Sequence, residues 1–390
     1  MLSILEANNI PTDNAQSTIN TCPGKPFFLQ HDFIRKYWQP ACLPEEKLPA
    51  MLSFADKIQT EPRYRLLAWH FYRYCTFTPI RNFKAADVPD IISGLGVETG
   101  MLYILIALSL IPSYIARAER ENFPVKYALD AAKRIGTTTC FYALNYDGAF
   151  GLRGSSLNFM FHYIETATWR IGRFDFVPMP CDNTIPEIYR KDGAVVAFCA
   201  DGTPLDKNND RCVKAEDAVR TAHIRINGSQ ITGIPIDFRT GLAKNQETSL
   251  DLDAGWERVA GPGDWTLFFH IPGGGGMKPE LCQESFLEAL TFFKSYMPDK
   301  KFRLIWSASW IFNPAWVEML PASNLASLIN RGRLFPTFSL GNPGLNFVFG
   351  KDSGAPDEFK AVNSVEKAVL QCYRENRLRR VGMFLLPDEL

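Results

Sequence analysis

The stretch FFHIPGGGGMKPELCQES, residues 268–285, joins the end of an apolar run to four consecutive glycines and then to the start of a helix. Glycines in a row carry a large entropic cost on folding, so they indicate a backbone that must approach another group closely. The first turn of a helix offers unpaired N–H groups and the positive end of the helix dipole. The stretch therefore predicts a site for a diphosphate or another anion, with Lys278 adding a direct charge. The alternative is a surface turn without a ligand.

The glycine run matches neither of the two common phosphate-binding motifs. No G-K-[ST] follows the glycines, as it would in a Walker A loop, and the Rossmann spacing G-x-G-x-x-G is absent. Glu280 would repel a phosphate if its side chain pointed inward. The prediction of an anion site thus depends on the strand–glycine–helix arrangement itself.

On both sides of the glycines, strand-like and helical patterns alternate. The final helix opens at Asn363 with Glu366 three residues on, which is the pattern of a capping box. Strands that alternate with single helices favour a layered α/β domain over a helical bundle. The sequence predicts strands at 265–272 and 302–307, a helix at 279–297, a short helix after 314, strand-like pieces at 334–340 and 345–350, and a closing strand at 380–386.

The N-terminal part of the chain has a different pattern. Apolar and aromatic residues recur at three- and four-residue steps from about residue 27 to residue 163, which predicts helices. From 166 to 178 the run TATWRIGRFDFVP predicts a strand, and the turn signals Asp201-Gly202 and Asn227-Gly228 predict two hairpins. We therefore expect an α+β protein with a polar leader at 1–26, a helical domain at 27–163 and an α/β domain at 164–390.

Charge and cysteine content limit the class of partner and the compartment. Lys plus Arg and Asp plus Glu number 42 each, so nothing in the net charge favours nucleic acid or an anionic membrane as a partner. The nine cysteines are scattered and form no C-x-x-C pair, which predicts reduced thiols and no metal site. Glu6 stands where a signal peptide would be basic, so we expect a cytoplasmic protein.

One uncharged run resembles a membrane span in composition. TGMLYILIALSLIPSYIA, residues 99–116, is at the lower limit of length for crossing a bilayer, and Pro112 interrupts it. Its flanks carry no clear membrane anchors. A buried helix of a soluble domain is the better prediction.

At this point several motifs resemble one family. The run from His270 to Phe302, together with SWIFNP (309–314), LNFVFGKD (345–352) and VGMFLL (381–386), resembles the GNAT-like C-terminal domain of bacterial acyltransferases. WRIGRFDF (169–176) and GWERVAGPGD (255–264) match the first strand of that domain and the lead-in to its central strand. MLYILIALSLIPSYIARAERENFP (101–124) resembles a helix of the N-acyltransferase N-terminal domain that precedes it. The resemblance covers most of the chain from about residue 60 onward.

The resemblance implies a GNAT-like layered α/β domain with a mixed central sheet. It also implies acetyl-CoA or another acyl-CoA as co-substrate, with pantetheine along the strand from Trp265 to Pro272 and the diphosphate at the glycines. The chain departs from the family pattern at two places: Q/R-x-x-G-x-G/A is replaced by PGGGGM, and Ser307-Ala308 stand where relatives often have Cys-His. The residues expected to bind the co-substrate are Phe269, Ile271, Gly273, Gly274, Gly275, Gly276, Met277 and Lys278.

Acyl transfer to an amine needs a base, and hydrogen-bond donors near the thioester carbonyl. His270 is placed best, at the end of the central strand, although it could simply shape the turn. His162 and Glu165, three residues apart, would share a face only in a helix, and packing at the domain junction is their alternative role.

Four further residues are candidates for contact with substrate, and two more could bind an anion. Arg170 and Arg173 could bind a carboxylate or phosphate, although a solvated or ion-paired arginine is the more common case. Ser309 and Trp310 belong to the SWIFNP segment that resembles the family. Arg331 and Arg333, two residues apart, would share a strand face and could likewise bind an anion or form surface ion pairs.

Two hypotheses from different classes remain open at the level of sequence. The first is an acyl-CoA-dependent N-acyltransferase, in which the amine of a small-molecule acceptor lying between the domains attacks the thioester directly. The second is a non-catalytic ligand-binding or interaction module that has kept the GNAT sheet and lost the CoA motif. No H-E-x-x-H and no G-x-S-x-G occurs, so a metalloprotease or serine hydrolase has no support.

Overall fold

The computed structural model describes residues 2–77, 82, 84–165 and 168–390. The chain divides into two compact units. The first comprises residues 1–175 together with the short segment 271–275, and the second comprises residues 176–270 and 276–390. The glycine run is therefore shared: its first three members belong to the helical unit and Gly276 to the other unit.

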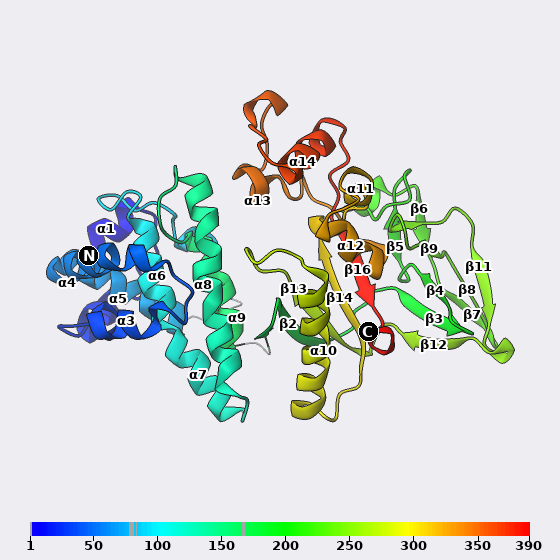
Figure 1. The fold of residues 1–390 in the computed structure, drawn as a ribbon, viewed down its shortest axis with the longest axis horizontal. Coiled ribbons are helices and arrows are strands. Elements are labelled where there is room, and N and C mark those ends of the chain that lie inside the picture. The colour runs from blue at the N-terminus through cyan, green and yellow to red at the C-terminus, as the bar shows by residue number, and fades with distance from the viewer. Residues whose placement is uncertain (1, 78–81, 83, 166–167) are drawn as a thin grey trace. The chain divides into compact units, whose positions relative to one another are not determined.

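The first unit is almost entirely helical, as the periodicity predicts (Figure 1). Its most apolar helix is α6, in which every side chain from Leu102 to Leu108 is fully buried. The stretch Thr99–Arg120 is long and apolar enough to cross a membrane, but 72% of its most apolar window is buried inside the protein, as in a core helix. The helices are α1 (Leu2–Ala7), α2 (Ala15–Thr21), α3 (His31–Trp38), α4 (Leu48–Thr60), α5 (Pro62–Phe77), α6 (Thr99–Ser109), α7 (Ile111–Arg120), α8 (Val125–Asn145) and α9 (Gly154–Glu165).

A hairpin follows the helices, where the sequence predicts one strand. β1 (Trp169–Ile171) and β2 (Phe174–Pro180) are separated by the two-residue turn Gly172-Arg173. Gly172 has φ +57°, and a glycine with positive φ at the first turn position is a standard way to close a two-residue hairpin. The prediction of a single strand is thus wrong, and its first residues, 166 and 167, lie outside the described part of the chain.

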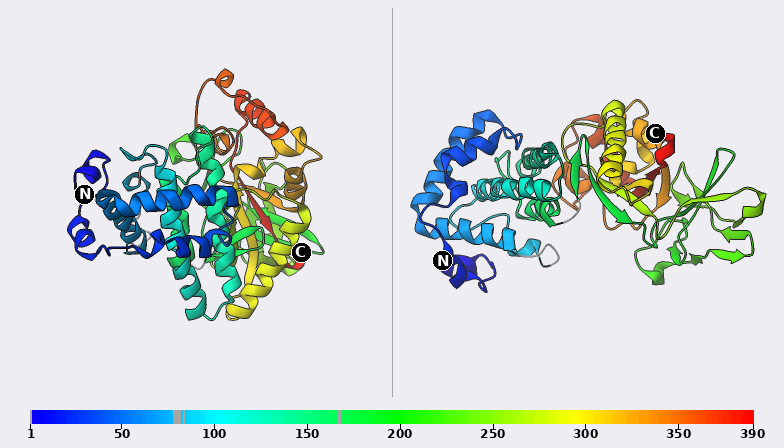
Figure 2. Two further views of the ribbon diagram at one scale, coloured as in Figure 1. Left: turned by 60° about the vertical axis from the view of Figure 1, so that its left-hand side comes forward. Right: turned by 90° about the horizontal axis from the view of Figure 1, so that it is seen from below.

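Most strands of a mixed sheet belong to the second unit, while β1 and the first two residues of β2 fall within the residues of the first. The sheet has six strands in the order β1-β2-β13-β14-β16-β15. β13 (Trp265–His270) and β14 (Phe302–Ser309) run parallel, whereas β16 (Val381–Leu385) is antiparallel to both β14 and β15 (Arg333–Pro336). Helix α10 (Pro279–Tyr296) lies across one face of the sheet (Figures 1 and 2). The predicted α+β class, with helices first and a mixed sheet second, is confirmed.

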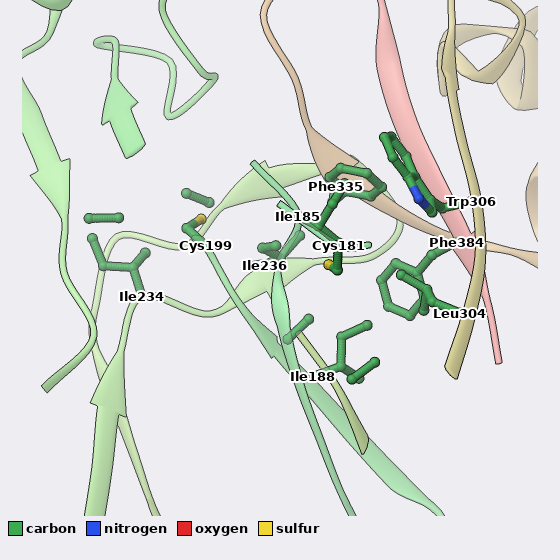
Figure 3. Close-up of a cluster of buried hydrophobic side chains, with 14 of the residues drawn as sticks. Cys181, Ile185, Ile188, Cys199, Ile234, Ile236, Leu304, Trp306, Phe335 and Phe384 are labelled. Atoms are coloured by element: carbon green, nitrogen blue, oxygen red, sulfur yellow. The ribbon is translucent and has the colours of Figure 1, made fainter. Parts of the chain in front are cut away.

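The other face of this sheet packs on small antiparallel sheets formed by the segment between β2 and β13. Leu304, Trp306, Phe335 and Phe384 of the main sheet face Ile185, Ile188, Ile234 and Ile236 of that segment in one apolar cluster (Figure 3). Burial of these side chains fixes the position of the small sheets on the main one. The strands are β3 (Glu187–Lys191), β4 (Ala194–Phe198), β5 (Thr203–Leu205), β6 (Arg220–Ala222), β7 (Arg225–Asn227), β8 (Gln230–Gly233), β9 (Ile236–Asp237), β10 (Leu242–Ala243), β11 (Thr248–Asp251) and β12 (Glu257–Ala260).

One of the two predicted hairpins in this segment is confirmed. β7 and β8 pair across the turn that follows Asn227. The hairpin predicted at Asp201-Gly202 is wrong, because β4 pairs with β3 and β5 pairs with β6. The Asp-Gly turn that does close a hairpin is Asp192-Gly193, where both residues have positive φ.

The remainder of the second unit follows the predicted alternation except at LNFVFG and at residues 324–331, which form a helix that the sequence analysis did not predict. LNFVFG does not form a strand: α13 (Leu345–Phe349) occupies it, with left-handed glycines, Gly344 and Gly350, at its two ends. The capping box of Asn363 and Glu366 opens α14 (Ser364–Arg374) as predicted. The other helices are α11 (Ala315–Met319) and α12 (Asn324–Arg331).

Candidate active site

Strand β13 presents different side chains to the two faces of the sheet. Phe269 is fully buried, and its ring lies 5.2 Å from that of Phe286 on α10. Phe268 points to the opposite face, where its ring lies 4.6 Å from Trp306 and 4.7 Å from the ring of His270. The alternation follows from the period of two in a strand. Phe269, expected to bind the co-substrate, thus has its side chain in the core against α10.

The glycine run adopts a conformation that few other residues could adopt. Gly274, Gly275 and Gly276 have φ values of +72°, +73° and +65°, all in the left-handed region. All three are exposed. Within the described residues, the N–H groups of Gly274 and Gly275 make no hydrogen bond to protein. These N–H groups therefore remain available to a ligand.

Contacts to the helical unit hold the beginning of the loop. The guanidinium Nη2 of Arg173 donates a hydrogen bond of 2.9 Å to the carbonyl oxygen of Pro272. A Cβ added to Gly273 would lie 3.0 Å from the carbonyl oxygen of Thr137 and 3.3 Å from the Phe141 ring on α8. Gly273 thus permits a close approach, whereas the next three glycines serve the turn.

Helix α10 begins directly after the loop without a side-chain cap. Lys278 is its N-cap residue and makes no capping hydrogen bond, and Pro279 occupies the first helical turn. Lys278 and Glu280 are exposed, and Met277 is buried. The positive end of the α10 dipole and the exposed glycine amides therefore lie close together in the chain, as the strand–glycine–helix pattern predicts.

The two parallel strands β13 and β14 stop pairing before they reach this loop. The register of β13 with β14 runs from Trp265↔Phe302 to Phe268↔Trp306 and ends there. β13 nevertheless continues to His270 and β14 to Ser309. Ligands of open α/β sheets bind at the carboxyl ends of parallel strands, where such a crevice forms.

A pocket of about 300 Å³ opens on the sheet face that carries Phe268. Its apolar wall is formed by Phe268, Trp306, Ala308 and Phe335. Trp306 Nε1 donates to Thr266 Oγ1 at 3.0 Å, and Thr266 Oγ1 donates to the Met179 carbonyl oxygen at 3.1 Å, so the indole is fixed in place. His270 is half-buried beside Phe268 and thus lies on the same sheet face as the pocket.

Two arginines, Arg211 and Arg380, also line this pocket, and sequence analysis did not identify either. Both stand in segments rich in charged residues, DKNNDRC and ENRLRRV, where one arginine cannot be told from another by pattern. They are 169 positions apart in the chain, and only the fold brings them together.

The remaining candidates lie elsewhere. His162 and Glu165 are in α9, and burial, followed by the charge of Arg134, lowers the pKa of His162. Arg170 donates to Asp175 at 3.3 Å in a buried cluster that also includes Arg134. The structure therefore places Arg170 in an ion pair of the helical unit.

Ser309 and Trp310 follow β14 directly. The hydroxyl of Ser309 caps the short helical turn 310–312 by accepting from the N–H of Ile311 at 3.2 Å. Trp310 packs edge-on against Trp316 and close to Gly344, where an added Cβ would lie 2.7 Å from the indole. Both residues are half-buried.

Arg331 and Arg333 also have protein partners. Arg331 hydrogen-bonds Gln283 and the carbonyl oxygen of Pro279 on α10. Arg333 pairs with both carboxylate oxygens of Glu389. Across the described residues, no group of three or more His, Cys, Asp or Glu side chains is arranged to hold a metal ion.

The strand order, the parallel β13–β14 pair and the glycine loop before α10 agree with a match to one protein family. Residues 168–383, more than half of the chain, match the model of the GNAT-like C-terminal domain. The chain belongs to this family. None of the curated proteins matches it.

Solved structures extend the likeness to the helical part of this GNAT-like chain. One is a crystal structure of an acyltransferase in complex with decanoyl-CoA and teicoplanin, with 17% identity and a TM-score of 0.56. Another is an acyltransferase in complex with CoA and 10C-teicoplanin, with 16% identity and a TM-score of 0.56. A third is a mutant acyltransferase in complex with octanoyl-CoA, with 16% identity and a TM-score of 0.55. Each comparison covers 90% of this chain and 87% of the other. At these identities the likeness establishes a shared fold.

Proposed function

We propose that this protein is an acyl-CoA-dependent N-acyltransferase that transfers an acyl group to the amine of a small-molecule acceptor by direct attack. The observation that carries the proposal is the run of exposed, left-handed glycines between β13 and the uncapped start of α10. The N–H groups of Gly274 and Gly275 and the helix dipole suit the diphosphate of CoA. The solved structures of similar fold, described as acyltransferases in complex with acyl-CoA or CoA, support the choice of donor.

In this proposal each part of the site has a distinct task. Gly274, Gly275 and Gly276 bind the diphosphate, and Lys278, exposed at the start of α10, adds a positive charge. The pantetheine lies where β13 and β14 separate after Phe268 and Trp306. The thioester carbonyl then stands at the carboxyl ends of the two parallel strands.

His270 is the proposed general base. It is the last residue of β13, half-buried, and on the face of the sheet that carries the pocket. It accepts the proton that the attacking amine loses, and the carbonyl carbon passes from sulfur to nitrogen without an enzyme-bound acyl intermediate. No histidine stands at position 308, where relatives often have one, so His270 is the histidine of the β13–β14 region.

Binding of CoA tests the proposal directly. Calorimetric titration with CoA and acetyl-CoA is expected to show binding to the natural chain, and Gly275→Asp is expected to weaken it at least tenfold by charge repulsion and backbone strain. Gly263→Asp is the matched control: Gly263 also has positive φ, +91°, and open space around its Cβ position. Absence of binding at millimolar CoA, or equal weakening by both changes, would contradict the proposal and favour a non-catalytic module.

The role of His270 is tested separately. His270→Gln is expected to leave CoA affinity unchanged and to lower kcat by about 10²-fold or more, because a general base contributes on the order of 10²–10⁴. A kcat close to that of the natural chain would remove His270 from the mechanism without affecting the CoA site.

A further inference from the structure

Two positively charged side chains line the pocket on the Phe268 face. Arg211 and Arg380 both line it, and in the part of the chain that the structure describes neither guanidinium belongs to an ion pair. Their guanidinium carbons lie 6.0 and 5.1 Å from the centroid of the Phe338 ring. Arg380 Nη1 also donates a hydrogen bond of 3.5 Å to the carbonyl oxygen of Phe338. Stacking on an aromatic face holds an arginine in place and leaves its other N–H donors available.

Two carboxylates, one beside Arg211 in the chain and one in the pocket lining, already accept hydrogen bonds from other groups. Asp210, next to Arg211 in the chain, accepts from Arg379 Nε at 2.7 Å and from the backbone N–H of Arg211 at 2.9 Å. Asp182 also lines the pocket, but it is exposed and its Oδ1 accepts from the N–H and hydroxyl of Thr184, at 2.8 and 2.5 Å. One partly engaged carboxylate thus faces two guanidinium groups, and the pocket carries a net positive charge.

The electrostatics of the two arginines agree with this geometry. Burial lowers the pKa of Arg211, an effect that the charge of Asp182 opposes. Burial also lowers the pKa of Arg380, and the positive charge of Arg211 lowers it further. Two guanidinium groups that repel each other in a half-buried pocket are stabilised when an anion binds.

The rest of the wall is apolar, which sets the kind of anion. Phe268, Trp306, Phe335 and Ala308 offer aromatic and aliphatic surface, and the Trp306 indole already has its hydrogen-bond partner in Thr266. A bare inorganic anion would leave this surface exposed to water, whereas an organic anion with an apolar body covers it.

We propose that this pocket binds a small carboxylate with an aromatic or branched apolar body, its carboxylate held by Arg211 and Arg380 and its body lying against Phe268 and Trp306. Guanidinium groups match the planar carboxylate with paired hydrogen bonds. This inference goes beyond acyl transfer, because binding can be measured with no CoA present. Resting on the proposed function, an acceptor of this class carries an amine in addition to the carboxylate, and the amine lies toward His270.

Calorimetric titration with 3-phenylpropionate tests the inference, and its neutral amide, 3-phenylpropionamide, serves as the matched ligand. The carboxylate is expected to bind more tightly than the amide by about tenfold, the size of a charged hydrogen bond. Arg211→Gln is expected to remove this difference and leave binding of the amide unchanged. Arg225→Gln, which removes an exposed arginine of the same segment paired with Glu247, is the control expected to have no effect.

A second variant tests the apolar part of the pocket. Ala308→Leu adds volume to the lining and is expected to weaken both the carboxylate and the amide, and its thermal unfolding midpoint without ligand shows whether it still folds. Equal affinity for carboxylate and amide, binding of inorganic phosphate as tight as that of 3-phenylpropionate, or no binding at millimolar ligand would each overturn the inference. CoA affinity is expected to be unchanged in Arg211→Gln, so failure here is distinct from failure of the proposed function.

Discussion

Single residues of this chain show how strongly burial controls protonation. His70 lies in α5 with 3% of its surface exposed, and its Nδ1 is 3.1 Å from the hydroxyl of Thr18 in α2. That hydroxyl donates to the carbonyl oxygen of Asn14 at 2.9 Å, so His70 Nδ1 must be the donor in the first pair. Burial, and then the charge of Arg73, favours the neutral ring and lowers the pKa of His70 to about 4.

A pH dependence of stability follows from His70. Between its unfolded pKa near 6.5 and the folded value of about 4, the unfolded state binds more protons, so stability is lost as pH falls through this window. The loss amounts to about 3 kcal/mol. Urea unfolding at pH 7 and pH 4.5 measures it. His70→Asn is expected to flatten the dependence while the exposed His31→Asn leaves it intact, and an unchanged slope in His70→Asn would assign the dependence to other groups.

The glycine run is the residue-level feature that sequence predicts best. A demand for positive φ can be met at little cost only by glycine, so four glycines in a row mark the turn whatever the rest of the fold does. Arg170 was less predictable. Whether an arginine contacts substrate or an internal carboxylate depends on Asp175, and the fold positions that carboxylate through the β1–β2 turn.

At the scale of elements, one buried ion cluster joins a helix to the β1–β2 hairpin within the helical unit. Asp175 has no exposed surface, and its two carboxylate oxygens pair with Arg134 of α8 at 2.5 Å and Arg170 of β1 at 3.3 Å. The Arg134 guanidinium also lies over the Phe159 ring of α9, 3.4 Å from its centroid. The cluster therefore ties three elements of the unit together.

Removal of the shared Asp175 carboxylate is expected to lower the free energy of unfolding substantially. Asp175→Asn leaves the buried Arg170 and the half-buried Arg134 without this counter-charge, and such a loss lowers the free energy of unfolding by about 3–5 kcal/mol. The exposed Asp56, paired with His31 at 2.9 Å in the same unit, provides the matched change Asp56→Asn, expected to cost about 1 kcal/mol or less. Urea unfolding of both variants gives the comparison, and similar costs would mean that the Asp175 cluster contributes no more than a surface pair.

Elements with strong local signals were predicted and elements with ambiguous signals were not. α10 and α14 have helical periodicity and clear starts, which act locally and do not need the rest of the fold. LNFVFG is a short apolar run, which periodicity cannot assign to helix or strand, and the left-handed Gly344 and Gly350 made it one turn of helix. Of the Asp-Gly turns, the one at 192–193 has strands of matching pattern on both sides, whereas the strands around 201–202 find other partners.

At the scale of the whole molecule, the solvent exposure of the nine cysteine thiols shows how much of the chain is closely packed. All nine cysteines are free; Cys42 and Cys140 are exposed, Cys22 is half-buried, and the other six are buried. Partial burial raises the pKa of the Cys140 thiol, which lowers its thiolate fraction at neutral pH. The buried thiols behave as small apolar side chains.

Titration with a thiol-specific disulfide reagent is expected to follow this order. Cys42 reacts first, Cys140 and Cys22 more slowly, and the remaining six only after addition of denaturant, because the thiolate must be formed and reached. Cys42→Ser is expected to remove the fastest phase alone. Rapid reaction of more than three thiols in the native protein would show that one of the units opens readily in solution.

The pocket could not be predicted from sequence because it exists only in the assembled second unit. Its walls come from β13, β14, β15 and the loops that carry Arg211 and Arg380, and no local pattern connects positions so far apart. The glycine loop, by contrast, is one continuous segment, so the sequence alone is enough to predict it. Sequence thus predicted the donor side of the proposed reaction and not the pocket proposed for the acceptor.

The glycine loop proposed for the donor and Arg211, one of the two arginines proposed for the second ligand, stand in different stretches of the chain. The glycines and α10 belong to the strand–loop–helix core, while Arg211 lies in the outlying segment between β2 and β13, among short strands packed on the far face of the main sheet. Under the two proposals, changes at Arg211 alter which ligand the pocket prefers without changing the backbone proposed to bind the donor. If the protein is the proposed acyltransferase, such a division lets its products diversify while the acyl-transfer chemistry stays constant.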